Sequence, residues 1–177
     1  MLLRISLVLV VAALFGRPAG GQQITKPAVP GAANFARLET TVACGGATTP
    51  EAVPEIKKMG FASIINLRLP TEAGANVDGE AAAAKTAGIK FYSIPFSGQS
   101  PDPAVADKFL ATITAPGNEP AYIHCAAGNR AGAMWMIKRL AVDHWDTERA
   151  YTEAAALGLT SPALKQFAID YAQSHKR

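Results

Sequence analysis

From residue 34 onward, short apolar runs alternate with helical patterns, an order that few folds accommodate. The runs at residues 61–67 and 89–94 have the length and composition of buried strands, and residues 120–124 form a third. Strands that alternate with helices through short connections predict an α/β domain with a mostly parallel central sheet flanked by helices. In such sheets, functional sites form at the carboxyl ends of the strands.

The expected helices have recognisable start and stop signals. Thr49 is expected to be the N-cap of a helix whose first residue is Pro50, and Gly60 is expected to end that helix. Asp102 and Pro103 repeat the starting pattern. The later helices are expected at about residues 78–87, 103–114, 128–143, 147–158 and from 162 onward.

The N-terminal segment is typical of a secretory signal. It carries one early charge at Arg4, an apolar run at residues 5–15 and small residues at 19–21. The run is about half of the ~20 residues that a membrane-spanning helix needs. We therefore expect a signal peptide at 1–21, a linker at 22–33 and one domain at 34–177, in a secreted or periplasmic protein without a stable membrane anchor.

Charge and metal-ligand spacing exclude two classes of function. Of the 17 basic residues, Arg4 and Arg17 lie in the expected signal, which leaves 15 against 14 acidic residues. A balanced chain of this kind does not predict a nucleic-acid partner, which requires clustered positive charge. The three histidines and two cysteines have no metal-ligand spacing, so neither a metal nor another cofactor is expected.

The turn after residues 120–124 carries the strongest chemical signal. Small residues there allow successive backbone N–H groups to point inward and bind an oxyanion at the start of the next helix. The partial positive charge at the start of that helix also stabilises a thiolate. An arginine at the helix start can donate two hydrogen bonds to a bound phosphate. The alternative is an inert buried cysteine before an ordinary helix. The turn consists of His124, Cys125, Ala126, Ala127, Gly128, Asn129 and Arg130.

At these residues the chain resembles the beta-lactamase-hydrolase-like phosphatases, which are related to dual-specificity and protein tyrosine phosphatases. The resemblance implies a cysteine-phosphatase-like fold, with a phosphocysteine intermediate at Cys125. It also implies that the amides of residues 126–129 and the Arg130 guanidinium hold the phosphate of a phosphorylated protein or small molecule, without a metal. It spans NFARL at 34–38, CGGATTPE at 44–51, GFASIINLR at 60–68 and YIHCAAGNRAGAMW at 122–135.

Two departures from the wider phosphatase pattern leave alternatives open. Only four residues separate Cys125 from Arg130, where the superfamily has five, and Ala131 replaces the usual Ser or Thr, whose hydroxyl helps the thiolate leave. The short loop also resembles that of the rhodaneses, so a sulfurtransferase with a persulfide on Cys125 is an alternative. A non-catalytic phosphate-binding module is a second alternative.

The reaction needs a general acid to protonate the leaving oxygen. Asp102 is the candidate, because it follows the strand at 89–94 in a loop where related phosphatases place theirs. Its alternative role is a helix N-cap. Glu72 and Asp78 are weaker candidates in a Gly-rich segment.

Three further residues have expected supporting roles. Arg68 is expected to contact substrate or, more conservatively, to brace a neighbouring loop. His124 is expected to orient the loop and tune Cys125. Cys44 ends an expected strand, and we hypothesise that it forms a reversible disulfide with Cys125 in an oxidising compartment.

Overall fold

The computed structural model describes residues 23–175, so the expected signal peptide at 1–21 lies outside the described residues. The strands are β1 (Ile24–Thr25), β2 (Ala36–Leu38), β3 (Val42–Gly45), β4 (Ser63–Asn66), β5 (Lys90–Ser93) and β6 (Ala121–His124). They form one sheet in the order β1-β2-β3-β6-β4-β5. The four strands from β3 to β5 in this order run parallel, while β1 and β2 pair antiparallel at one edge. The expected α/β class with a mostly parallel sheet is confirmed.

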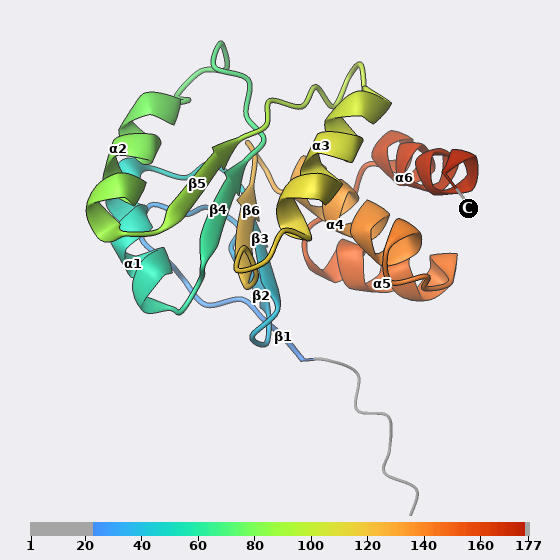
Figure 1. Cartoon of the computed structure of the whole chain (residues 1–177), viewed down its shortest axis with the longest axis horizontal. Helices are drawn as coiled ribbons and strands as arrows, with labels where there is room; N and C mark the ends of the chain where they lie inside the picture. Colours follow the sequence, from blue (N-terminus) through green and yellow to red (C-terminus); the bar gives the residue numbers. More distant parts are fainter. Residues whose placement is uncertain (1–22, 176–177) are drawn as a thin grey trace, which may run out of the picture.

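Helices cover both faces of this sheet. They are the short 3₁₀ helix η1 (Pro50–Ala52), α1 (Val53–Lys58), α2 (Val77–Ala87), α3 (Pro103–Ile113), α4 (Asn129–Ala141), α5 (Thr147–Ala156) and α6 (Pro162–Ser174). Figure 1 shows α1 and α2 on one side of the strands and α3 to α6 on the other. Within residues 23–175, no helix is both long and apolar enough to cross a membrane.

Most helix boundaries follow the signals seen in the sequence. The Asp102 side chain accepts a hydrogen bond from Ala104 N (2.9 Å), and Gly88 ends α2 with a φ of 65°. The first helix differs from expectation, since residues 50–52 are 3₁₀ and regular α-helix begins only at Val53. Pro54 explains this difference, because it has no N–H to donate to the Pro50 carbonyl in an α-helical bond.

The segment expected as a linker at 22–33 is instead part of the domain. Ile24 and Thr25 pair with Leu38 and Arg37 at the edge of the sheet. Further along, Ala32 forms a bridge with Thr48, and both residues are buried. The prolines and small residues of this segment suggested flexibility, but pairing with the open edge of β2 and burial of isolated apolar side chains fix its course.

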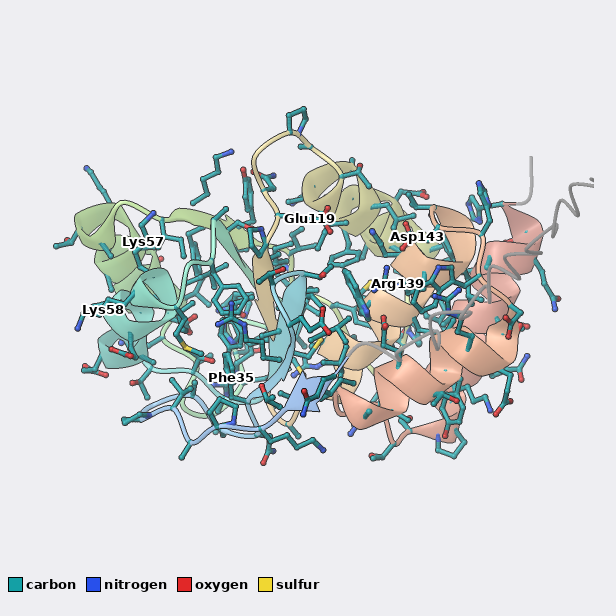
Figure 2. All side chains as sticks on the ribbon, turned by 90° about the horizontal axis from the view of Figure 1, so that it is seen from below. Phe35, Lys57, Lys58, Glu119, Arg139 and Asp143 are labelled. Atoms are coloured by element: carbon teal, nitrogen blue, oxygen red, sulfur yellow. The ribbon has the colours of Figure 1, made fainter. Side chains whose placement is uncertain are left out.

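Two apolar cores lie on the two faces of the sheet. Alternation along β6 sends Ile123 into the core under α3 to α6 and Tyr122 into the core under α1 and α2. Phe35 packs against Tyr122 with ring centroids 5.4 Å apart, and Figure 2 shows it on the α1 and α2 side. On the opposite side, Arg139 of α4 pairs with Asp143 at 2.9 Å (Figure 2).

The register of the parallel strands brings three carboxyl ends together. Gly45 of β3 and Asn66 of β4 are both Cα partners of His124 at the end of β6. The segments that follow these residues therefore meet at one edge of the sheet. The turn that contains Cys125 follows β6, and it lies between the segments that follow β3 and β4.

Candidate active site

A tight loop joins β6 to α4 and contains Cys125. Gly128 is the N-cap of α4 and has a φ of 105°, a conformation that only glycine adopts without strain. Cys125 N donates to Gly45 O (3.2 Å), which anchors the start of the loop to β3. The two following carbonyls are also held from outside, since Ala126 O accepts from Ala47 N (2.9 Å) and Ala127 O from Asn34 Nδ2 (3.3 Å).

The Cys125 sulfur lies inside this loop. Gly128 N donates to Cys125 Sγ across 3.2 Å, and the cysteine is only 1% exposed. Asn129 and Arg130 occupy the first turn of α4, where backbone N–H groups have no intrahelical acceptor, and no side chain caps this end. The sulfur thus accepts the Gly128 N–H at the positive end of α4, and a helix start without a side-chain cap is suited to binding an oxyanion.

Arg130 is fixed by acceptors from the two segments that follow β4 and β5. Its Nη1 and Nη2 contact the two Glu72 carboxylate oxygens at 2.5 and 2.8 Å. Nη1 also donates to Phe96 O (2.9 Å) and Leu67 O (3.2 Å). Burial by itself lowers the pKa of Arg130, but hydrogen bonding to Glu72 and attraction to Cys125 and Glu72 outweigh burial and raise it. The guanidinium is therefore charged and oriented before any ligand binds.

Glu72 is the anionic partner of that guanidinium. Hydrogen bonding from Arg130 outweighs partial burial and lowers the pKa of Glu72 from 4.5 to about 2, with smaller contributions from Leu69 N and Arg68. At neutral pH this carboxyl group has no proton to donate. Its position in the site is that of a support for Arg130, and it does not fit the role of general acid that the sequence suggested for it.

Arg68 braces the loop that carries Glu72. Its guanidinium donates to Ala73 O (2.6 Å) and Gly74 O (2.9 Å) and contacts Glu72 Oε2 (3.3 Å). Of the two roles expected for Arg68, the structure therefore places it in the bracing one.

Asn129 ties the loop to the connection between α5 and α6. Its Oδ1 accepts from Thr160 N (2.7 Å), Thr160 Oγ1 (3.1 Å) and Ser161 N (2.7 Å). These bonds occupy the side-chain oxygen, so Asn129 can offer its Nδ2 and its backbone N–H to a ligand.

Two pockets adjoin the loop and the start of α4. One measures about 570 Å³ and includes Ala127 and Asn129 together with residues of the N-terminal segment such as Lys26 and Asn34. The other, of about 450 Å³, contains Arg130. It is lined by Leu69, Glu72, Ser97, Gly98, Gln99, Asn129, Arg130, Ser161 and Leu164.

The remaining candidates lie around this arrangement. Asp102 is exposed at the N-terminus of α3, where it caps the helix, and it does not line the Arg130 pocket. Asp78 is exposed in the first turn of α2. His124 points to the α2 face, where its Nε2 lies 2.8 Å from Glu80 Oε2. Cys44 is buried in the same core as Cys125, and both are free thiols.

Several contributors to the site escaped the sequence analysis. Glycine 46 approaches the loop so closely that a Cβ would meet Ala126 O at 3.0 Å, which explains the second glycine of the CGG motif. Asn34, the first residue of the NFARL motif, holds Ala127 O. Glu80 and Asn66 are buried behind His124. The local signal for Glu80 is its spacing from Ala84, which places an acidic side chain on the buried face of α2.

A family model matches most of the described chain. The model is described as a DSP-PTPase phosphatase fused to NAD⁺ kinase, and it covers residues 26–169. A search of curated proteins finds no match to the sequence.

Solved structures share the fold at low sequence identity. A DUF442 protein from Shewanella putrefaciens has a TM-score of 0.68 at 18% identity, covering 83% of this chain and 96% of its own. The core catalytic domain of the PP-IP phosphatase Siw14 from S. cerevisiae has a TM-score of 0.65 at 21% identity, covering 81% and 88%. P. aeruginosa TpbA in complex with pTyr has a TM-score of 0.59 at 16% identity, covering 89% and 90%. These similarities support the cysteine-phosphatase fold.

Proposed function

The chain belongs to the family described as DSP-PTPase phosphatase fused to NAD⁺ kinase, and we propose that it hydrolyses phosphate monoesters through a phosphocysteine at Cys125. One observation carries the proposal. The Cys125 sulfur accepts the Gly128 N–H inside a loop that also presents the free amides of α4 and the charged Arg130. A nucleophile, an anion site and a phosphate clamp are thereby combined within six residues.

In the first step, the phosphate of the substrate enters the loop and the thiolate attacks phosphorus. The S–P bond forms as the P–O bond to the leaving group breaks, and the leaving oxygen takes a proton. The loop amides and Arg130 stabilise negative charge on the phosphoryl oxygens, which is the largest contribution that such a site makes. Two Arg130 contacts are already used by Glu72, so the ligand takes the remaining donors of the guanidinium.

We assign the proton donor to Asp102, as the sequence suggested. Glu72 is ionised, which removes the carboxyl group nearest to Arg130 from the candidates. Asp102 follows the segment at 97–99 that lines the Arg130 pocket. Leaving groups that need no protonation do not require this acid.

In the second step, water attacks phosphorus, the S–P bond breaks, and inorganic phosphate leaves with the thiolate restored. Ala131 offers no hydroxyl to assist the departing sulfur. This step is therefore expected to limit turnover, and the phosphocysteine to accumulate.

The proposed substrates are phosphotyrosine, phosphoserine or a small phosphoester. The complex of TpbA with pTyr supports the first of these for a protein of this fold. The Arg130 pocket, at about 450 Å³, has room for an organic group of that size.

Hydrolysis of p-nitrophenyl phosphate by the full chain tests the proposal. Turnover by the parent and its loss in Cys125→Ser are expected, together with a phosphoenzyme trapped on Cys125 in the parent. Equal hydrolysis by Cys125→Ser would contradict the mechanism. Vanadate binding by both proteins without turnover by the parent would instead indicate a phosphate-binding module, and thiocyanate formation from cyanide and thiosulfate would indicate a sulfurtransferase.

We further propose that the protein is exported and processed near residue 21. The support is the charge, apolar run and small residues of the first 21 positions. N-terminal sequencing of the protein recovered from an exporting host tests this, and an unprocessed chain beginning at Met1 would contradict it.

A further inference from the structure

The larger of the two pockets beside the loop has no role in the proposed mechanism. It measures about 570 Å³ and lies between the N-terminal segment at 26–36, the loop and the end of α5. Because loop residues line both this pocket and the one that contains Arg130, a group attached to a phosphate in the loop has two spaces to enter. We call the larger space the Lys26 pocket, and its lining includes Lys26, Asn34, Ala127, Asn129, Leu157 and Thr160.

Lys26 gives this pocket a positive charge that no neighbouring side chain neutralises. The side chain is exposed, and it makes no hydrogen bond or ion pair with any residue from 23 to 175. Among the described residues that line the pocket, Lys26 is the only ionisable one and none is acidic. An ammonium group is a compact point charge with three donors, so it binds anions without demanding one geometry. The pocket is therefore complementary to an anionic group.

The backbone that carries Lys26 belongs to the same framework as the loop. Thr25, the preceding residue, is part of β1, which pairs with β2. Further along the segment, Ala33 N donates to Ala47 O (2.9 Å), and Ala47 N donates in turn to Ala126 O (2.9 Å). These hydrogen bonds connect the wall of the pocket to the loop, so the positive charge is placed relative to the phosphate site before any ligand binds.

The wall between Lys26 and the loop suits an uncharged organic linker. Val29, Phe35 and Leu157 contribute apolar side chains to it. At the end nearest the loop, Asn129 has its side-chain oxygen occupied by three hydrogen bonds and retains Nδ2 as a donor. A pocket of apolar groups with a few placed polar ones is the usual form of a small-molecule site.

The Arg130 pocket, in contrast, does not suit a second anion. Its charged lining residues are Arg130 and Glu72, which pair with each other. Hydrogen bonding from Arg130 lowers the pKa of Glu72, so this carboxyl group is ionised and repels a negative group on the substrate. An uncharged ring fits beside Arg130, whereas an organic anion is better placed in the Lys26 pocket.

We propose that the Lys26 pocket is a specificity site, in which Lys26 selects small phosphoesters whose organic part carries a carboxylate. One ammonium group neutralises one carboxylate, whereas a further phosphate would leave negative charge in a pocket that has no other cation among its described residues. The inference rests on the proposed function, because the loop has to hold the phosphate that is hydrolysed.

A matched pair of aryl phosphates tests this selection. The phosphate esters of p-hydroxyphenylpropionic acid and of its primary amide have similar phenol leaving groups, since two methylene groups separate the ring from the group that differs. The parent should hydrolyse the acid with a kcat/KM about two- to fivefold higher than the amide, which is the range of an exposed ion pair. The advantage of the acid should shrink as salt concentration rises.

Substitution of Lys26 assigns the preference to this side chain. Lys26→Met keeps the length of the side chain and should lower the ratio of kcat/KM for the acid to that for the amide by the same two- to fivefold, while Lys26→Arg should preserve the ratio. Lys85→Met is the matched control, because Lys85 is an exposed lysine in the last turn of α2 and its loss changes the net charge equally. An unchanged ratio in Lys26→Met, or an equal fall in Lys85→Met, would overturn the proposal.

A binding measurement separates failure of this proposal from failure of the proposed function. The non-hydrolysable phosphonate analogue of the acid, added to the Cys125→Ser protein, should shift the ¹H–¹⁵N signals of residues 26–36 and 156–160 together with those of the loop. Shifts confined to the loop and the Arg130 pocket would overturn the Lys26 pocket even if the parent is a phosphatase. Shifts in the Lys26 pocket without turnover by the parent would overturn the phosphatase and leave Lys26 as a recognition residue of a binding module.

Discussion

Replacing Glu72 with glutamine removes the charge that holds Arg130. The Glu72 pKa is lowered from 4.5 to about 2, mainly by hydrogen bonding from Arg130, and the side chain is only 21% exposed. At about 1.4 kcal/mol per pH unit, this lowering corresponds to roughly 3 kcal/mol of folding free energy at neutral pH. In a domain of this size, Glu72→Gln should therefore lower the melting temperature by roughly 6–12 °C.

The sign of the pH dependence follows from the direction of the shift. A carboxyl group with a lowered pKa in the folded state stabilises the fold fully above its unfolded pKa of 4.5, and this stabilisation is lost as pH falls through about 2. Urea denaturation of the parent should show this loss between those limits. Glu72→Gln should lack this contribution of Glu72 to the free energy of unfolding. The difference in unfolding free energy between the two proteins should therefore shrink as pH falls.

The same substitution should weaken vanadate binding by about tenfold, because Arg130 keeps only its two carbonyl acceptors and loses its orientation. Glu55→Gln, which alters a half-exposed ion pair on α1, is the control and should change stability by less than about 0.5 kcal/mol. Equal stability of Glu72→Gln and the parent at neutral pH, with parallel pH profiles, would refute the reasoning.

Three other changes test separate parts of the site. Asp102→Asn preserves the cap on α3 but should slow hydrolysis of alkyl phosphates by about a hundredfold or more, while hydrolysis of p-nitrophenyl phosphate stays unchanged. Equal slowing of both substrates would exclude Asp102 as the acid. Gly45→Ala places a Cβ against the Tyr122 hydroxyl and should cost about 1–3 kcal/mol in urea denaturation, whereas unchanged stability would show that Tyr122 moves freely. Ala131→Ser should raise turnover and reduce the trapped phosphoenzyme in rapid-quench measurements, and an unchanged phosphoenzyme level would mean that sulfur departure does not limit the reaction.

The short loop from Cys125 to Arg130 is accommodated by its glycine and by external supports. Gly128 turns the chain with a φ of 105° directly into α4, which leaves Arg130 in the first helical turn. From there its side chain reaches Glu72 and the Leu67 and Phe96 carbonyls. Because the acceptors come from the segments after β4 and β5, the clamp is oriented by the edge of the sheet and does not depend on the length of the loop.

Local sequence identified most elements of the fold. The cap at Asp102 and the glycine at 60 mark helix ends where the structure has them, because capping and left-handed backbone depend on neighbouring residues only. The prediction of a linker at 22–33 is wrong where residues 24, 25 and 32 are paired, because their order comes from pairing with β2 and with Thr48, which are not their neighbours in the sequence.

The loop at residues 125–130 is contiguous, so the sequence by itself determined the proposed nucleophile, the small residues and the arginine. Tertiary structure alone decided which side chain holds that arginine, since Glu72 lies 58 positions from Arg130, and which carboxylate stands behind His124. An acidic residue in a Gly-rich loop and another in an Ala-rich helix have the same chemistry as many exposed carboxylates. Only the tertiary fold, which sets their burial and their distance from a partner, makes one the support of Arg130 and places the other, buried, beside His124.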